Sequence, residues 1–153
     1  MSKVAFLGGG SFGTALSIML AKKGISVNIW DRKLSVIDDI NIKRENIKYL
    51  PSVIIPAGVT AFTDLEKGMS DCELIVLAVP SHAIRGLSKL IAPYLKQNQI
   101  IVSIAKGIEE GSSKRISQVI EEEISINPIV ILSGPSHAEE VALDIPTNSS
   151  SYI

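Results

Sequence analysis

Residues 4–13 read Val4-Ala5-Phe6-Leu7-Gly8-Gly9-Gly10-Ser11-Phe12-Gly13, an apolar strand that runs directly into a glycine turn and the start of a helix. This arrangement is typical of a site for a pyrophosphate. Gly8 permits the tight turn, Gly10 lacks the β-carbon that would keep the backbone away from a pyrophosphate, and Gly13 lets the helix lie close to the strand. The phosphates would then lie at a helix N-terminus, where free N–H groups and the helix dipole favour an anion by about 0.3 to 1 kcal/mol.

The segments that follow favour this interpretation, although a glycine turn without a ligand explains the motif by itself equally well. Residues 14–23 carry apolar side chains at helical spacing, end in two lysines and precede Gly24, which favours helix termination. Residues 26–30 are predicted to be the next strand, which completes a βαβ unit. A Walker-type phosphate loop is excluded, because no Gly-Lys-Ser or Gly-Lys-Thr follows the turn.

Asp31 and Arg32 follow this second strand, about 20 residues beyond the turn, where an acid is expected to accept hydrogen bonds from the adenosine ribose. An acid at this position favours NAD, whereas an arginine beside it can bind a 2′-phosphate and stack on adenine. The pair therefore leaves NAD and NADP open. The alternative is a solvated Asp-Arg pair at the end of a strand.

Composition limits the class of protein. The chain has 153 residues, 15 basic and 16 acidic side chains and a net charge of −1, without a block of lysines and arginines, so we expect one domain and no binding of nucleic acid. The first strand begins directly after Met1-Ser2-Lys3, and the apolar runs are too short to cross a membrane. We therefore expect a cytoplasmic protein with no signal peptide and no membrane insertion.

The single cysteine, Cys72, excludes an internal disulfide, and no cluster of metal ligands surrounds it.

The remaining sequence alternates between predicted strands and helices. Apolar runs predict strands at residues 59–62, 74–79, 100–104 and 129–132, and helical patterns run from Ser81 to about residue 95 and from about Ser112 to Glu123. Residues 47–58 contain two prolines and are predicted to be a loop. Continuous apolar strands between helices are typical of a parallel sheet covered on both faces. The expected fold class is therefore α/β, a Rossmann-type doubly wound and mostly parallel sheet.

Ligands of such a sheet bind beyond the carboxyl ends of its strands, so candidate site residues are those that follow each strand. Lys106 is placed to meet a phosphate or a developing oxyanion, and the alternative is a surface lysine beside a turn. Residues 134–136, Gly-Pro-Ser, either present N–H groups and a hydroxyl to a substrate or begin a helix with Ser136 as its N-cap and Glu139 as the partner in a capping box. The two histidines of the chain, His82 and His137, are expected to be polar lining.

Six blocks carry a resemblance when they are taken together: Gly8–Ala15, Ile29–Arg32, Tyr49–Pro51, Ala78–Ser81, Ala105–Glu109 and Ser133–Val141. They resemble the N-terminal domain of the bacterial type of NAD(P)-dependent glycerol-3-phosphate dehydrogenase, from residue 4 to about Thr147. The resemblance implies reversible hydride transfer between NAD or NADP and the second carbon of glycerol 3-phosphate, which gives dihydroxyacetone phosphate, in the synthesis of glycerophospholipid precursors.

The resemblance also implies which residues form the site. To Gly8, Gly10, Gly13 and Asp31 of the glycine fingerprint it adds Ser11, Phe12, Arg32, Tyr49, Lys106 and Ala138 as cofactor-binding residues and Lys106, Gly134 and Ser136 as substrate-binding residues. No complete catalytic set is expected in this chain, because the general-base lysine of the family and its ligands for the substrate phosphate belong to an all-helical C-terminal domain.

The last residues depart from the family, which continues into a further apolar strand and then the helical domain. This sequence instead has Asn148-Ser149-Ser150-Ser151-Tyr152-Ile153. We therefore expect a dinucleotide-binding domain at residues 1–147, a polar divergent tail at 148–153, a fold that lacks the C-terminal helical domain, and no turnover by this chain alone. The alternative is a stand-alone dinucleotide-binding module without catalysis. Another dehydrogenase of the same fold, such as a ketoacid or nucleotide-sugar enzyme, explains the glycine turn but not the blocks around Lys106 and Gly134. The formation of a homo-oligomer is left open.

Overall fold

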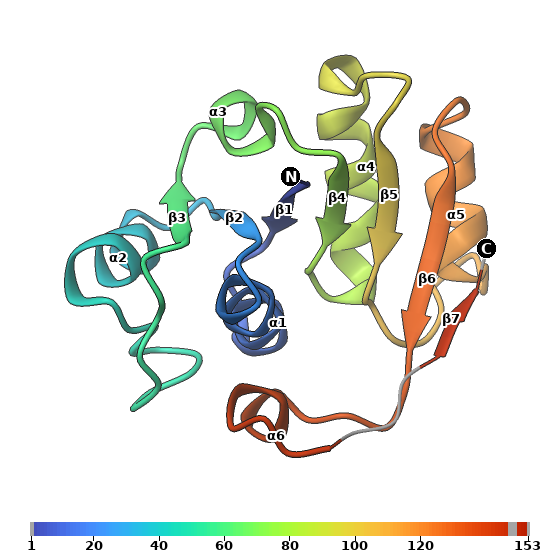
Figure 1. Cartoon of the computed structure of the whole chain (residues 1–153). Coiled ribbons are helices and arrows are strands. Elements are labelled where there is room, and N and C mark those ends of the chain that lie inside the picture. Colours follow the sequence, from blue (N-terminus) through green and yellow to red (C-terminus); the bar gives the residue numbers. More distant parts are fainter. Residues whose placement is uncertain (1, 147–149, 153) are drawn as a thin grey trace.

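The computed structural model describes residues 2–146 and 150–152, which form a seven-stranded sheet in the order β3-β2-β1-β4-β5-β6-β7 (Figure 1). The first six strands are parallel and the seventh is antiparallel to β6. Their bounds are β1 Lys3–Leu7, β2 Ser26–Trp30, β3 Val59–Phe62, β4 Leu74–Leu77, β5 Ile100–Ser103, β6 Ile129–Ser133 and β7 Ser150–Tyr152. The order of the first six is that of a Rossmann sheet, which confirms the predicted fold class.

Helices cover both faces of the sheet. Successive side chains of each strand point to opposite faces, so both faces carry apolar side chains that the helices bury. On β1, Val4 and Phe6 belong to one hydrophobic cluster, and Ala5 and Leu7 belong to the other. The first face is covered by α1 Ser11–Lys22, α2 Leu34–Asp38 with the adjoining π-helix η1 Asp39–Lys43, and α6 Ala138–Ala142. The second face is covered by α3 Leu65–Met69, α4 Ile84–Ile91 and α5 Ile116–Glu123.

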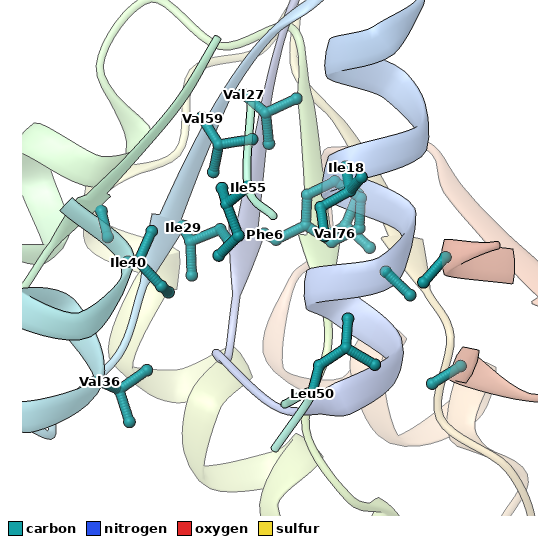
Figure 2. Packing of buried hydrophobic residues seen from close by; sticks show 14 of the residues in the cluster. Phe6, Ile18, Val27, Ile29, Val36, Ile40, Leu50, Ile55, Val59 and Val76 are labelled. Atoms are coloured by element: carbon teal, nitrogen blue, oxygen red, sulfur yellow. The ribbon is translucent and has the colours of Figure 1, made fainter. Parts of the chain in front are cut away.

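The first cluster is a close-packed core around β1. Figure 2 shows Phe6 of β1 and Val76 of β4 between Ile29 of β2 and Ile18 of α1. Leu50 and Ile55, from the segment between η1 and β3, belong to the same cluster. The predicted loop at residues 47–58 is thus confirmed as a region without regular helices or strands, yet it contributes apolar side chains to the core.

Several predicted helix starts were wrong, for local reasons. Helix α1 begins at Ser11 rather than residue 14, because Gly10 already takes the extended conformation of an N-cap. Helix α5 begins at residue 116 rather than about 112, because Gly111 and Ser113 have φ values of +87° and +56° and break the helical backbone. Ser81 lies within the short 3-10 helix η2 Ser81–Ala83 rather than capping α4. A further 3-10 helix, η3 Ala92–Tyr94, follows α4.

The proposed capping box at the start of α6 is also wrong. The N-cap of α6 is His137, which makes no side-chain capping hydrogen bond, so Ser136 and Glu139 do not form the expected pair. Ser136 therefore remains a candidate for contact with a ligand rather than a helix-capping residue.

Residues 147–149 and 153 lie outside the described residues, and the expected domain boundary between residues 147 and 148 falls there. Residues 150–152 of the expected polar tail form β7, which pairs with β6 along the sheet edge. Within residues 2–146 and 150–152, the longest apolar helical stretches fall short of what a membrane crossing requires.

Candidate functional site

The glycine turn after β1 has the geometry that its sequence predicts. Gly8 has a φ of +123°, and a β-carbon there would lie 2.3 Å from the carbonyl oxygen of Ala78. A β-carbon on Gly13 would lie 2.9 Å from the β-carbon of Ala78 and 3.0 Å from the Gly8 oxygen. A side chain at either position would collide with other parts of the protein. The two glycines therefore let α1 pack close to β1 and to the residue that follows β4.

Gly10 differs from these two glycines, because a β-carbon on it would meet no protein atom within 4 Å. The residue is the N-cap of α1, and Thr14 N–H donates the first helical hydrogen bond to its carbonyl oxygen at 3.0 Å. The N–H groups of Ser11, Phe12 and Gly13 are therefore left without helical acceptors. An open space in front of unpaired N–H groups at the positive end of a helix is suited to an anion.

A pocket of about 520 Å³ opens beyond the carboxyl ends of β1, β4 and β5. Seven of the predicted site residues line it: Gly10, Ser11, Phe12, Gly13, Lys106, Ser136 and Ala138. Lys106, an exposed residue, lines the pocket, with Nζ 3.5 Å from the carbonyl oxygen of Ser136 and 5.9 Å from the ring centre of Phe12. The structure thus brings together residues that come from three separate parts of the sequence.

A second pocket, of about 490 Å³, adjoins the first one. Gly134 lines it, together with apolar side chains such as Leu16 and Leu132. Phe12, Lys106 and Ser136 line both pockets. An ammonium group at this shared wall can reach an anion in either space.

A third pocket, of about 350 Å³, lies beyond β2 and is lined by Gly8, Trp30, Asp31 and Arg32, among others. The carboxylate of Asp31 holds the glycine turn in place, because its Oδ2 accepts a hydrogen bond from Gly9 N–H at 2.8 Å and its Oδ1 accepts one from Lys33 N–H at 2.9 Å. An ionised carboxylate has further acceptor sites, so Asp31 can also accept from a ligand hydroxyl.

Positive charge gathers next to Asp31, around the predicted site residue Tyr49. The hydroxyl of Tyr49 lies 2.6 Å from Lys33 Nζ, and the Nζ atoms of Lys33 and Lys48 lie 5.4 and 5.3 Å from the Tyr49 ring centre. The hydrogen bond from the Lys33 ammonium lowers the pKa of the Tyr49 phenol and raises the pKa of Lys33. Arg32 has its guanidinium carbon 6.0 Å from the Trp30 ring centre, and it lines the third pocket together with Lys33. Cations in this pocket suit a phosphate group on the adenosine side of a dinucleotide.

Sequence reasoning missed Asn46, which ties the Tyr49 segment to the glycine turn. Its side chain is buried, and Nδ2 donates hydrogen bonds to the Gly9 carbonyl oxygen at 2.8 Å and to Thr14 Oγ1 at 2.9 Å. Oδ1 of Asn46 is buried without a hydrogen-bond partner among the described residues. No periodicity or motif near residue 46 indicates this contact, because its partners lie 37 and 32 residues away.

Comparison with known proteins gives consistent matches. Residues 3–151 match the family described as NAD-dependent glycerol-3-phosphate dehydrogenase N-terminus. A glycerol-3-phosphate dehydrogenase [NAD(P)+] of Clostridium tetani is 61% identical over 144 residues, which cover 94% of this chain and 41% of that protein.

Solved structures agree with this match. A crystal structure of glycerol-3-phosphate dehydrogenase from Coxiella burnetii superimposes with a TM-score of 0.92 at 33% identity over 98% of this chain and 46% of that one. The glycerol-3-phosphate dehydrogenase of Saccharomyces cerevisiae superimposes with a TM-score of 0.83 at 27% identity, over 94% and 44%. This chain therefore spans less than half the length of each of these relatives.

Proposed function

The chain belongs to the NAD-dependent glycerol-3-phosphate dehydrogenase family, matching its N-terminal part, and from this premise we propose that it binds NAD or NADP and presents the nicotinamide to glycerol 3-phosphate or dihydroxyacetone phosphate. The observation that carries the proposal is the convergence of the glycine turn, Lys106 and Ser136 on one pocket at the carboxyl edge of the sheet. Glycerol 3-phosphate and NAD(P)+ are the reactants in the name of the Clostridium tetani relative, and dihydroxyacetone phosphate is the ketone that hydride removal from the second carbon of glycerol 3-phosphate gives.

Each residue has a distinct role in this proposal. The N–H groups at the start of α1 bind the pyrophosphate, and Asp31 and Arg32 bind the adenosine side, with Tyr49 and its lysines nearby. Phe12 and Ala138 line the nicotinamide end. Lys106 contacts both cofactor and substrate, since it lines both adjoining pockets, and Gly134 and Ser136 contact the substrate. Hydride transfer also needs a base within hydrogen-bond reach of the substrate hydroxyl, which the resemblance places in the C-terminal domain of the family.

A chimeric protein tests the proposal. Residues 1–146 of this chain are joined to the C-terminal remainder of the Clostridium tetani relative, and oxidation of NADH or NADPH is followed with and without dihydroxyacetone phosphate. We expect oxidation that depends on dihydroxyacetone phosphate. A chimera that binds the cofactor but never turns over, beside an active Clostridium tetani enzyme, would favour the competing function of a dinucleotide-binding module without catalysis.

Arg32 is expected to discriminate between the two cofactors. Arg32→Ala should weaken NADPH binding more than NADH binding, by about 1 to 3 kcal/mol, because the guanidinium would make charge-assisted contacts to the 2′-phosphate. Quenching of Trp30 fluorescence can measure both affinities, since Trp30 lines the same pocket as Arg32. Lys89→Ala removes an equal charge from α4 and serves as the control. An equal loss of both affinities would mean that Arg32 stacks on adenine or supports the fold.

Asn46 is expected to support cofactor binding as well as stability. Asn46→Ala leaves the Gly9 oxygen and the Thr14 hydroxyl without their donor, which should cost about 1 to 3 kcal/mol in the free energy of unfolding and also weaken NADH binding. Asn127 provides a matched control, because its Nδ2 donates to the carbonyl oxygens of Lys96 and Gln99 at 2.8 and 2.9 Å, ahead of β6. Asn127→Ala should lower the stability measured by urea unfolding without weakening NADH binding. Similar effects of both variants on binding would contradict a specific role for Asn46.

A further inference from the structure

A cluster of five charged side chains, Arg85, Glu109, Lys114, Glu122 and Glu123, lies between α4, α5 and the segment that follows β5, and none of them lines the three pockets described above. Arg85 on α4 makes a two-pronged contact with Glu109, in which Nε lies 2.7 Å from Oε1 and Nη2 lies 2.8 Å from Oε2. Its Nη1 lies 2.8 Å from a carboxylate oxygen of Glu122 and 2.7 Å from one of Glu123, both on α5. One guanidinium therefore connects three parts of the fold.

Glu109 lies three residues after Lys106, in a segment that has little regular structure of its own. Gly107, Gly111 and Ser113 in this segment all have positive φ values. Two backbone hydrogen bonds run within the segment, from Glu109 N–H to the Lys114 oxygen at 2.9 Å and from Ser113 N–H to the Glu109 oxygen at 3.0 Å. At its start, Ile104 N–H donates to the Leu77 oxygen at 3.3 Å, and near its end Lys114 pairs with Glu122 on α5, where both side chains are well exposed and water screens their attraction. The middle of the segment, around Glu109, needs a further contact to fix it against the body of the domain.

The contact with Arg85 attaches the middle of the segment to α4. The side chains of Arg85 and Glu109 are only 27% and 16% exposed, so water screens their attraction less than it does for an ion pair on the open surface. The Arg85 guanidinium, together with the Ser112 hydroxyl 2.6 Å away, lowers the pKa of Glu109 to about 2. Glu109 is therefore ionised at neutral pH, and the parallel hydrogen bonds of an arginine fork fix direction as well as distance.

We propose that the Arg85–Glu109 ion pair is a positioning pair for Lys106. The fork holds the segment after β5 against α4, and this keeps the start of the segment, where Lys106 leaves the sheet, in one place. Lys106 Nζ then stays at the wall shared by the two adjoining pockets, near the Ser136 carbonyl oxygen. What Lys106 contacts there rests on the proposed function, whereas the attachment of the segment does not.

Amide hydrogen exchange of the chain itself tests the attachment. Glu109→Gln keeps the size of the side chain and removes its charge, and we expect the Glu109 and Ser113 amides to exchange about 10-fold faster, with the sheet unchanged. Glu123→Gln is the matched control, because it removes another carboxylate partner of Arg85 and leaves the Arg85–Glu109 ion pair intact. Arg85→Lys keeps the charge without the fork and should give an intermediate rate. Unchanged exchange in Glu109→Gln, or an equal acceleration in Glu123→Gln, would overturn the proposal.

A double-mutant cycle tests the link to Lys106. The Kd for NADPH is measured for the wild-type chain, Glu109→Gln, Lys106→Ala and the double variant. If the pair acts through Lys106, Glu109→Gln should weaken binding about 5-fold in the wild-type background and by less than about 2-fold when Lys106 is absent. Additive effects would overturn the positioning role. If the wild-type chain binds no NADPH, the proposed cofactor site fails, and the exchange comparison by itself decides whether the pair holds the segment.

Discussion

Replacing Gly10 with valine is expected to abolish the binding of NADH and NADPH while the chain stays folded. A β-carbon at this position would meet no protein atom within 4 Å, so the cost of the substitution to the fold should be about 1 kcal/mol, the ordinary cost of losing a glycine N-cap to a branched apolar residue. The same side chain would fill the space in front of the first turn of α1, where the pyrophosphate is expected. Quenching of Trp30 fluorescence measures binding, and circular dichroism with urea unfolding measures the fold.

Gly13→Val provides the contrast for this experiment. Its β-carbon would press against Ala78 and the Gly8 oxygen, so the variant should lose about 1 to 3 kcal/mol of stability from the β-carbon alone, as expected for an overpacked core position, and more from the two methyl groups of valine. The Gly10→Val variant should therefore lose cofactor binding, whereas the Gly13→Val variant should lose stability in urea unfolding. Wild-type affinity in Gly10→Val would mean that the turn is not the pyrophosphate site.

Replacing Lys106 with alanine is expected to lower kcat/KM for dihydroxyacetone phosphate about 100- to 1,000-fold in the chimeric protein, the usual loss when one charged or hydrogen-bonding group that stabilises a transition state is removed. The ammonium group lies where it can hold the substrate and stabilise the oxygen that becomes negatively charged as hydride leaves the nicotinamide.

Lys114→Ala is the control for this variant. Lys114 belongs to the same segment after β5, but its ammonium pairs with Glu122 on α5 rather than facing the pockets. It should retain nearly full kcat/KM. An active Lys106→Ala variant would show that Lys106 is the surface lysine of the alternative interpretation.

The sequence predicted the core of this fold because the relevant interactions are local. An apolar strand, a glycine turn and a helix lie within residues 3–22, and the side chains that pack between β1 and α1 are set by the two- and 3.6-residue periods of strands and helices. The short helices α2 and α3 were not predicted, because of their length. Helices α2 and α3 have five residues each, too few for a periodic pattern to stand out from the surrounding segments.

The candidate site residues were predicted one by one, partly through the family resemblance, and the sequence placed them beyond the carboxyl ends of the strands, but it did not predict which of them share a pocket. Which of the predicted residues share a pocket follows from the strand order, which puts the ends of β1, β4 and β5 at one edge of the sheet. Asn46 escaped prediction because an asparagine just before a proline-containing loop is ordinary, and only the folded chain places its amide beside the glycine turn.

The sequence by itself determined that a glycine turn would join a buried strand to a helix, and that a lysine would follow a later strand. The tertiary structure decided that the Nζ atom of this lysine lies 3.5 Å from the carbonyl oxygen of a residue 30 positions away, and that an arginine 24 positions before Glu109 pairs with its carboxylate. The physical reason is range. Backbone conformation and strand or helix periodicity act over a few residues, whereas contacts between distant residues exist only after the hydrophobic packing of both sheet faces has fixed where each strand ends.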